Sequence, residues 1–333
     1  MTEILPVTLL TPAPRFTVRF ARTAEEIAAT QKLRYRIFAG ELGADIDGGA
    51  EGLDTDQYDA HCQHLMVLDN TTGEVIACTR ILTEDAAEAT GGFYSASEFD
   101  LEMIEALPGR VMEIGRTCVA AEHRGGGVIA TLWQGIAEYI TTQGYDYLFG
   151  CASIGLEDGG AAAHAIIDAI RAKHMTPESQ RVRPYYGLPM ADRKLAITPK
   201  MPPLLKAYIS LGAKACGEAY WDRDFNCADV FMLLNVSDLN PRYARHFLAR
   251  STPAAAERWS YWRNERRATF DGGPWPPFCF GTATHSIRGE EPLRHRVQSA
   301  LRAARTPRCQ PPRLRPAALR DHQSRLHRPG ECG

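Results

Sequence analysis

The chain has 333 residues, a formal net charge of −2 and a hydrophobic share of 44%. That length accommodates one large or two medium domains, and that hydrophobic share suits a packed core. The charge is unevenly distributed, because residues 1–250 are acidic overall, whereas residues 251–333 are rich in Arg, lack Lys and are basic. A total this close to neutral gives no reason to expect a nucleic-acid partner.

Secretion and membrane insertion are both disfavoured by the sequence. No apolar run approaches the roughly 20 residues that span a bilayer. Residues 1–16 lack a basic region and contain prolines, which disfavours a signal peptide. The nine cysteines include no C-x-x-C pair, as is typical of free thiols in a reducing compartment. We therefore expect a cytoplasmic protein.

The N-terminal part is predicted to alternate strands and helices. Residues 16–21 alternate like a strand, and Thr23 with Glu26 has the spacing of a capping box that opens an amphipathic helix reaching residue 43. A loop rich in Gly and Asp follows. Two apolar runs around Asn-Thr-Thr-Gly then predict a hairpin at 64–82. Residues 93–107 combine a short extended piece with a helix.

The next elements surround a glycine-rich junction. A strand that starts at residue 111 leads to Arg124, three glycines and a helix at 128–140. The remaining predicted elements are a strand at 145–154, a helix at 202–213 and a strand at 226–236. We place a domain at 1–250 and a tail at 251–333. The tail is interpreted either as a disordered basic extension or as GC-rich sequence read out of frame, and no function is assigned to it.

The junction has the composition of an anion site. A helix N-terminus offers unpaired N–H groups and a partial positive charge, glycines allow close approach, and Arg124 adds a cation. It could therefore bind a phosphate or a pyrophosphate. The alternative is a glycine turn that simply leads into a packed helix. Neither the P-loop motif nor G-x-G-x-x-G is present, so a nucleotide-hydrolase or dinucleotide site lacks its signature.

The run V-x(4)-R-G-x-G at 119–127, followed by a helix, resembles the acyl-CoA-binding motif of the GNAT N-acyltransferase superfamily. The resemblance implies an α/β fold with a mixed, mostly antiparallel sheet, a splayed central strand and flanking helices. Ile129 replaces the usual Gly or Ala, which favours a donor with one phosphate, such as acyl carrier protein. The 4′-phosphopantetheine arrives on that donor, so no resident cofactor is expected. The implied donor-binding residues are Cys118, Val119, Arg124, Gly125, Gly126 and Gly127.

A set of charged residues extends the resemblance to about residues 18–247. Its order and spacing resemble the charged framework of acyl-homoserine-lactone synthases. Four strings, at 91–101, 145–154, 202–213 and 224–234, resemble more closely the L-ornithine N-acyltransferases that make lyso-ornithine lipid. This implies transfer of a 3-hydroxyacyl chain from acyl carrier protein to the α-amino group of L-ornithine. The set consists of Arg34, Phe38, Asp56, Asp59, Arg80, Glu113 and Arg116.

Glu113 is the candidate base, acting directly or through water, because burial on an apolar strand would raise its pKa. Residues 113 and 116 point to opposite faces of a regular strand, so both reach one site only if a bulge lies between them, at Gly115. The GNAT resemblance implies such a bulge, whose freed N–H would polarise the thioester carbonyl. Arg116 is the second candidate catalytic residue. The alternative is a structural ion pair between Glu113 and Arg116.

The acceptor-binding candidates are the other charged residues of this framework. An amino acid offers a carboxylate, which suits arginine, and an ammonium group, which suits aspartate. The alternative is a set of salt bridges that hold the N-terminal loop over the sheet. These candidates are Arg34, Phe38, Asp56, Asp59 and Arg80.

Three further features favour ordinary structural roles. His61, Cys62 and His64 lack a distant partner pair, so no metal site is expected. Cys118 and Cys151 lie on buried strands and are interpreted as small hydrophobes rather than nucleophiles. The apolar face of the helix at 202–213 could contact a membrane, but a place in the core is favoured.

Two alternatives to the ornithine acyltransferase stay open. One is an enzyme like the acyl-homoserine-lactone synthases, which would use S-adenosylmethionine. The other is a non-catalytic module that binds an acyl carrier or a lipid. An amphiphilic product would also allow a peripheral contact with the inner face of the membrane.

Overall fold

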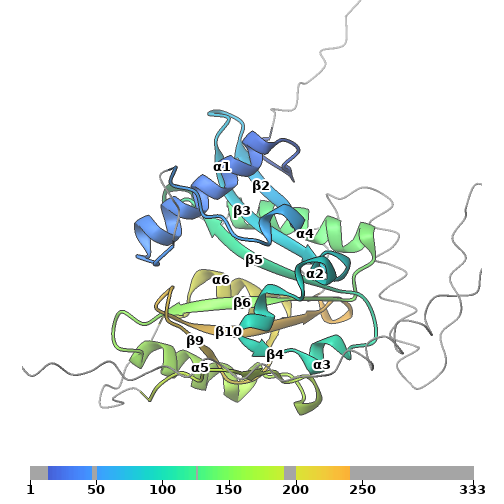
Figure 1. Cartoon of the computed structure of the whole chain (residues 1–333), viewed down its shortest axis with the longest axis vertical. Coiled ribbons are helices and arrows are strands. Elements are labelled where there is room, and N and C mark those ends of the chain that lie inside the picture. The colour runs from blue at the N-terminus through green and yellow to red at the C-terminus, as the bar shows by residue number, and fades with distance from the viewer. Residues whose placement is uncertain (1–13, 47–50, 125–126, 191–199, 241–333) are drawn as a thin grey trace, which may run out of the picture. The chain divides into compact units, whose positions relative to one another are not determined.

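The computed structural model describes residues 14–46, 51–124, 127–190 and 200–240. The predicted boundary at residue 250, the tail and two of the junction glycines lie outside the described residues. The centre of the described part is a mixed sheet with strand order β1-β2-β3-β5-β6-β10-β8 (Figure 1). The strands are β1 (Phe16–Phe20), β2 (Gln63–Asp69), β3 (Val75–Thr83), β5 (Val111–Val119), β6 (Tyr147–Gly155), β8 (Lys214–Ala215) and β10 (Cys227–Asn235).

Three short strands complete the pairing. Strand β9 (Tyr220–Asp222) pairs with β10, and β4 (Phe99–Asp100) forms a separate pair with β7 (Arg183–Pro184). Within the named strands the pairing of β5 with β6 is parallel, and the other pairs are antiparallel. The predicted sheet, mixed and mostly antiparallel, is confirmed.

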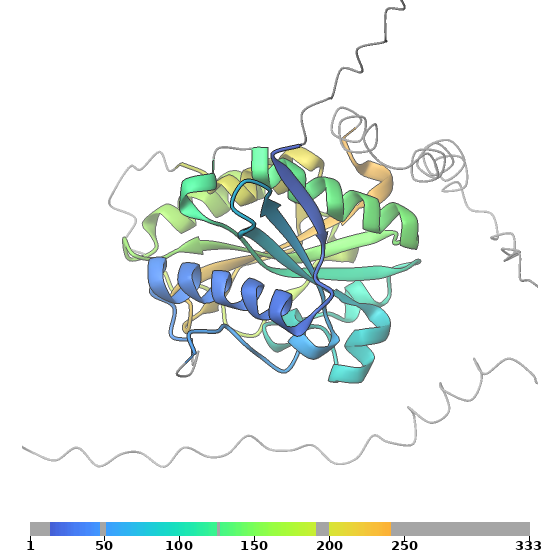
Figure 2. The ribbon, with the colours of Figure 1, turned by 90° about the horizontal axis from the view of Figure 1, so that it is seen from above.

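Helices cover both faces of the sheet (Figure 2). One face packs against α4, α5 and α6, and it buries the largest apolar cluster. The other face packs against α1 and against the segment around residues 93–107, over two smaller clusters. The helices are α1 (Ala24–Tyr35), α2 (Glu84–Thr90), α3 (Glu102–Glu105), α4 (Gly127–Gln143), α5 (Ala161–Lys173) and α6 (Pro203–Leu211).

The first helix begins as predicted but ends differently. The side chain of Thr23 accepts a hydrogen bond from the N–H of Glu26, so the predicted N-terminal cap is confirmed. The α-helix ends at Tyr35, and the chain continues as a π-helical turn, Arg36–Glu41, instead of the predicted α-helix to residue 43. Such wide turns are rare and often lie at functional sites. This one carries Phe38 to the wall of two cavities.

The prediction for residues 93–107 was only partly right. The extended piece is β4, but the helical part is reduced to a 3₁₀ turn, Tyr94–Ser97, and the four-residue α3. The predicted hairpin, the strands β6 and β10 and the helices α4 and α6 are confirmed with small shifts at their ends. Helix α5 was missed.

Helix α6 belongs to the core rather than to a membrane-facing surface. Leu205, Tyr208 and Leu211 are at most 5% exposed, and Leu204 packs against the same cluster. The core placement favoured by the sequence is therefore confirmed. Within the described part of the chain, no helix combines the length and the apolar character needed to cross a bilayer.

The sheet opens between β5 and β6. Their register runs only from Val111–Tyr147 to Glu113–Phe149. At the next position Gly150 lies so close to β5 that a Cβ there would overlap the carbonyl oxygen of Ile114. Beyond it the two strands have no further registered pairs. The predicted splayed central strand is confirmed.

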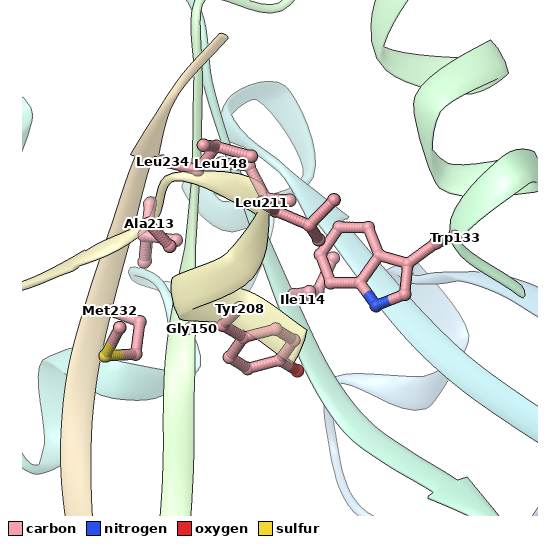
Figure 3. Close-up of a pocket in the computed structure, with 10 residues that line it drawn as sticks. Ile114, Trp133, Leu148, Gly150, Tyr208, Leu211, Ala213, Met232 and Leu234 are labelled. Carbon is pink, nitrogen blue, oxygen red and sulfur yellow. The ribbon is translucent and has the colours of Figure 1, made fainter. Parts of the chain in front are cut away.

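The opening is filled from the side of α4 and α6. Trp133 and Tyr208 meet edge to face there, with ring centroids 5.4 Å apart. Figure 3 shows these two rings with Leu211 beside the strands, around a cavity of only about 20 Å³. Trp133, Tyr208 and Leu211 thus leave little space at this part of the splay.

Strand β5 contains the predicted bulge. Its register against β3 shifts between Cys78, which opposes Cys118, and Arg80, which opposes Gly115. One residue of β3 thus faces two residues of β5, and Arg116 takes a left-handed conformation with φ of 52°. The bulge follows Gly115 directly.

Candidate active site

A polar cavity of about 330 Å³ lies where β5 and β6 diverge. Four of the predicted site residues line it: Phe38, Arg80, Glu113 and Arg116. The bulge allows residues 113 and 116 to face the same space, as the sequence analysis required. The wall also contains residues that the sequence analysis did not assign to the site, namely Tyr94, Ser95, Ser153, Asp222, Phe225, Cys227 and Asp229.

Glu113 is buried and held by the 3₁₀ turn. Its carboxylate accepts hydrogen bonds from the N–H of Tyr94 at 2.7 Å and of Ser95 at 2.9 Å, and from the Ser95 hydroxyl. Burial raises the pKa of Glu113, and these hydrogen bonds only partly offset the rise. A raised pKa makes this carboxylate a stronger base, as general-base catalysis requires.

The expected alternative, an ion pair between Glu113 and Arg116, is wrong. Within the described ranges Arg116 instead binds Asp54, with Nε 3.1 Å from Oδ2, and donates to the hydroxyl of Tyr94 at 3.2 Å. Its guanidinium also lies over the rings of Tyr94 and Phe225. These contacts fix the side chain of the bulge residue beside the cavity.

Arg34 and Asp59 lie outside the cavity, in a buried ion-pair network. Arg34 is 1% exposed, and its Nη1 and Nη2 bind the two carboxylate oxygens of Asp59 at 2.8 and 3.0 Å. Its Nε binds Asp54 at 2.8 Å. Burial acts to raise the pKa of Asp59, but Arg34 and Arg80 outweigh it and lower this pKa to about 2. This geometry matches the alternative of salt bridges that hold the N-terminal loop over the sheet.

Arg80 links this network to the cavity. Its Nη1 lies 2.6 Å from Asp56 and 3.4 Å from Asp59. Neither Nε nor Nη2 of Arg80 forms a hydrogen bond to any described residue, although the side chain lines the cavity. Arg80 can therefore donate hydrogen bonds from Nε and Nη2 to a ligand in the cavity. Asp56 does not line the cavity, and its Oδ2 has no hydrogen-bond partner among the described residues.

The far side of the cavity is acidic. Asp229 on β10 accepts a hydrogen bond from Ser153 on β6 at 2.6 Å, and Asp222 on β9 accepts two from the backbone of the following turn. Glu98 lies behind them, and the Cys151 thiol donates to it at 3.5 Å. Burial and the charges of Asp229 and Asp222 raise the pKa of Glu98 to about 9, and burial raises that of Asp229 to about 6.

A second, more apolar cavity of about 400 Å³ continues along β5. The two cavities share five wall residues: Phe38, Leu42, Thr117, Pro202 and Leu204. Of the predicted donor-binding residues, Cys118, Val119 and Arg124 line the second cavity. Gly127 is the first residue of α4, and Gly125 and Gly126 lie outside the described residues. Ile129 also lines this cavity.

Arg124 is tethered at the mouth of the second cavity. Its Nη2 lies 2.6 Å from Glu41 at the end of the π-helical turn, and its Nε donates to the carbonyl of Val119. Both partners are exposed, so the pair is weak and exchangeable.

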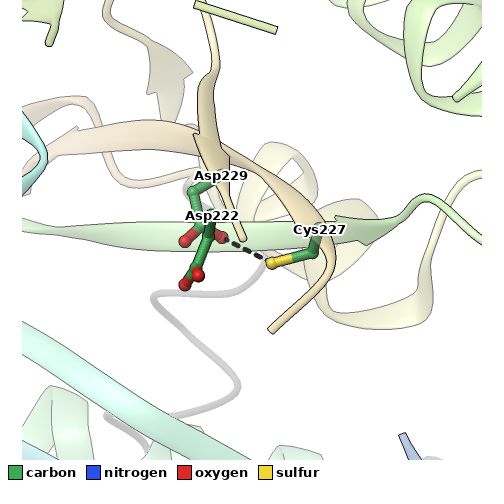
Figure 4. Close-up of side chains that lie close together, drawn as sticks. All are labelled: Asp222, Cys227 and Asp229. Atoms are coloured by element: carbon green, nitrogen blue, oxygen red, sulfur yellow. Dashed lines mark hydrogen bonds between the residues drawn. The ribbon is translucent and has the colours of Figure 1, made fainter. Parts of the chain in front are cut away.

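The histidines and cysteines singled out from the sequence have structural contacts. His64 bonds to the carbonyl of Asp59 at 2.9 Å, and Cys62 packs in an apolar cluster. Cys118 lies 3.6 Å from Cys78, sulfur to sulfur, and burial raises the pKa of the Cys151 thiol. Cys118 is thus a buried thiol, whereas Cys151 is half-buried at the wall of the polar cavity. A different trio, Asp222, Cys227 and Asp229, has ligand atoms within 4.8 Å of one another (Figure 4).

Comparison with known proteins identifies the family. The domain family described as acetyltransferase (GNAT) domain matches residues 33–134. The L-ornithine N(alpha)-acyltransferase of Rhizobium meliloti (strain 1021) is 36% identical over 69% of this chain and 83% of its own. That of Rhodobacter capsulatus is 33% identical over 71% of this chain and 95% of its own. The chain belongs to the L-ornithine N(alpha)-acyltransferase family. It is therefore an N-acyltransferase with a GNAT-like fold.

Solved structures give more distant matches to this acyltransferase. The acyl-homoserine-lactone synthase LasI aligns with a TM-score of 0.42 and 14% identity, over 71% of this chain and 96% of its own. FeeM, an N-acyl amino acid synthase from uncultured soil microbes, aligns with a TM-score of 0.42 and 12% identity, over 68% of this chain and 97% of its own.

Sequence reasoning missed residues that line this acyltransferase's cavity or that hold its arginines in place. Asp54 lies in the loop whose neighbours Asp56 and Asp59 were noticed, so its acidic spacing was a usable signal. Tyr94 and Ser95 lie within a string that was quoted only for its resemblance. Asp229 interrupts an apolar strand, and a charge at such a position is itself a signal of a site.

Proposed function

We propose that this chain transfers a 3-hydroxyacyl group from acyl carrier protein to the α-amino group of L-ornithine, which gives lyso-ornithine lipid. The observation that carries the proposal is the pair of contiguous cavities on β5, with the buried carboxylate of Glu113 at the point where the sheet opens. The names of the relatives support ornithine as the acceptor.

The apolar cavity is the proposed place of the donor. Its wall of aliphatic and proline side chains suits a pantetheine arm and the start of a fatty chain. The phosphate would lie near Arg124 and the N-terminus of α4, where N–H groups and the helix dipole favour an anion. Arg124 would then exchange its exposed partner Glu41 for the phosphate. Ile129 adds apolar surface next to this end of the cavity.

The polar cavity is the proposed place of the acceptor. Arg80 and Arg116 face it and suit the α-carboxylate of an amino acid. Arg34 and Asp59 hold the wall behind Arg80 and do not themselves meet the ligand. Phe38 lines both cavities and would lie where the thioester meets the amine.

The chemistry needs no covalent enzyme intermediate. The amine nitrogen attacks the thioester carbonyl, the new C–N bond forms and the C–S bond breaks. Glu113 takes a proton from the ammonium or the attacking amine, directly or through water, and the departing thiolate takes up a proton in turn. Backbone N–H groups freed by the bulge after Gly115 would stabilise the oxyanion. The amphiphilic product would leave at the membrane surface.

The full chain, expressed in a host that lacks aminolipids, provides the test. We expect mass spectrometry to find ornithine carrying one 3-hydroxyacyl group, and the Glu113→Gln variant to lose about 10²- to 10⁴-fold in rate while it still binds acyl carrier protein. If the protein is soluble and folded, both substrates are present and no acylated ornithine forms, the proposal of ornithine as the acceptor would be overturned. Full activity of Glu113→Gln would remove Glu113 from the mechanism.

A further inference from the structure

Three carboxylates form an acidic group at the far side of the polar cavity: Glu98, Asp222 and Asp229. In the described part of the chain none of them forms an ion pair with a cation. Asp229 is only 5% exposed, and one of its oxygens, Oδ1, is held by Ser153 and Cys227. Its other oxygen, Oδ2, has no hydrogen-bond partner among the described residues, although the side chain lines the cavity.

Asp222 repeats this arrangement from the neighbouring strand. The register of β9 against β10 places Asp222 opposite Cys227, on the same face as Asp229. Its Oδ1 accepts the N–H groups of Asp224 and Phe225, and its Oδ2 has no partner among the described residues. Figure 4 shows the two carboxylates converging beside the Cys227 thiol. Each carboxylate is thus fixed by one oxygen and presents the other.

Such a cluster is unfavourable when no cation is bound. Like charges that are buried together repel and lose hydration, and each of these effects favours protonation. The pKa of Asp222 is raised, first by burial, as are those of Glu98 and Asp229. A ligand ammonium placed between the two free oxygens would relieve the repulsion and gain two charged hydrogen bonds.

We propose that Asp222 and Asp229 bind the side-chain ammonium of the acceptor and so select a dibasic amino acid over a monobasic one. The inference rests on the proposed function, because it assigns a specificity to the same cavity.

The charges of the cavity are arranged to orient such an acceptor. Arg80 and Arg116 come from β3 and β5, on one side of the opening in the sheet. Asp222 and Asp229 come from β9 and β10, on the other side, and Glu113 lies on β5 where the sheet opens. An α-carboxylate at the arginines and a distal ammonium at the aspartates leave the α-amine as the group nearest to Glu113. Glu98, behind the aspartates, does not line the cavity and is not part of the ligand site.

A divalent metal is the other occupant that this geometry allows, since Cys227 lies with the two aspartates at liganding separation. Burial raises the pKa of the Cys227 thiol, so a metal would first have to displace its proton. An ammonium site needs only the two carboxylate acceptors, and the thiol can remain a donor to Asp229.

The experiment compares L-ornithine with L-norvaline, which has the same carbon chain and no side-chain amine. For the full chain we expect kcat/KM to favour ornithine. Asp229→Asn and Asp222→Asn should each lower kcat/KM for ornithine by about 10- to 100-fold and leave that for norvaline nearly unchanged. The matched control is Asp224→Asn, an exposed aspartate of the same turn that does not line the cavity.

Calorimetric binding of both amino acids gives a readout that does not depend on turnover. We expect ornithine to bind more tightly than norvaline, and Asp229→Asn to abolish the difference. An unchanged preference in both aspartate variants would overturn the inference, even if ornithine is acylated. If a chelator abolished ornithine binding and Zn²⁺ or Mn²⁺ restored it, the aspartates would bind a metal ion rather than the ammonium group, and the inference would be overturned. Binding of ornithine without acylation would instead count against the proposed function.

Discussion

Two groups of buried charges lie next to the same cavity and differ in one respect. In the first, Arg34, Asp54 and Asp59 are paired with one another at hydrogen-bonding distance, and Arg34 is 1% exposed. In the second, Glu98, Asp222 and Asp229 have no cationic partner among the described residues. Complete pairing suits a structural role, because a buried charge without a partner lowers the stability of the fold. The incomplete group is the one that a ligand can complete.

The largest effect is expected from breaking the paired group. Arg34→Met removes the cation and leaves Asp54 and Asp59 buried without it, which should lower the free energy of unfolding by about 3–5 kcal/mol. Urea unfolding at pH 7 measures this. A loss below 1 kcal/mol would mean that the network is not a structural wall, and Arg34 would again be a candidate for acceptor binding.

The sheet opens between these two groups of charges, next to Gly150 of β6. Gly150→Ala places a Cβ against the carbonyl of Ile114 and should destabilise the fold by about 1–3 kcal/mol. Gly115→Ala is the matched control, because a Cβ there has no heavy atom within 4 Å and the backbone is not left-handed. Thermal unfolding of both variants compares them. Equal losses would contradict the close approach of the strands at residue 150.

Removing a charge from the unpaired group should stabilise the fold at neutral pH, whereas Arg34→Met should destabilise it. Because folding raises the pKa of Asp229 from 3.8 to about 6, its contribution to stability falls as the pH rises through that window. Asp229→Asn removes this loss, so its free energy of unfolding, relative to the unsubstituted chain, should rise by about 2 kcal/mol between pH 4 and pH 7. Urea unfolding at both pH values measures it. A difference that falls with pH would indicate that Asp229 has a cationic partner.

The smallest effect on stability is expected from exposed ion pairs. Arg171 on α5 contacts Asp168 and Glu218, and all three side chains are largely exposed. Arg171→Ala should change the free energy of unfolding by less than about 1 kcal/mol, and salt should reduce the change further. If the same unfolding assay gave a loss as large as that of Arg34→Met, burial would not be what separates the groups.

The sequence predicted those parts of the fold that depend on neighbouring residues. The cap at Thr23, the hairpin turn and the glycine-led start of α4 are local patterns, and each was found. The bulge was also predictable, because two charges at 113 and 116 could share a site only if the strand was irregular. Helix α5 was missed although Ile166, Ile167 and Ile170 have helical spacing, since its N-cap residue is a glycine and the capping carboxylate comes from Asp158, two residues earlier.

The acidic group could not be predicted in the same way. Glu98 comes from a turn, whereas Asp222 and Asp229 come from β9 and β10, and β10 pairs with both β9 and β6. The two aspartates meet across the short turn between β9 and β10, but the place of the distant Glu98 beside them is set by the strand order of the whole sheet. The different roles of the arginines could not be predicted either. The spacing of residues in the sequence does not show that Arg34 is fully buried while Arg80 faces the cavity.

A competition assay tests the central claim most directly. The full chain and its Asp229→Asn variant each receive equal concentrations of L-ornithine and L-norvaline with one acyl donor, and mass spectrometry measures the ratio of the two acylated products. We expect acyl-ornithine to predominate with the unsubstituted chain and the ratio to fall by at least about 10-fold in the variant. The same ratio from both proteins would contradict the claim that the unpaired carboxylates bind the acceptor.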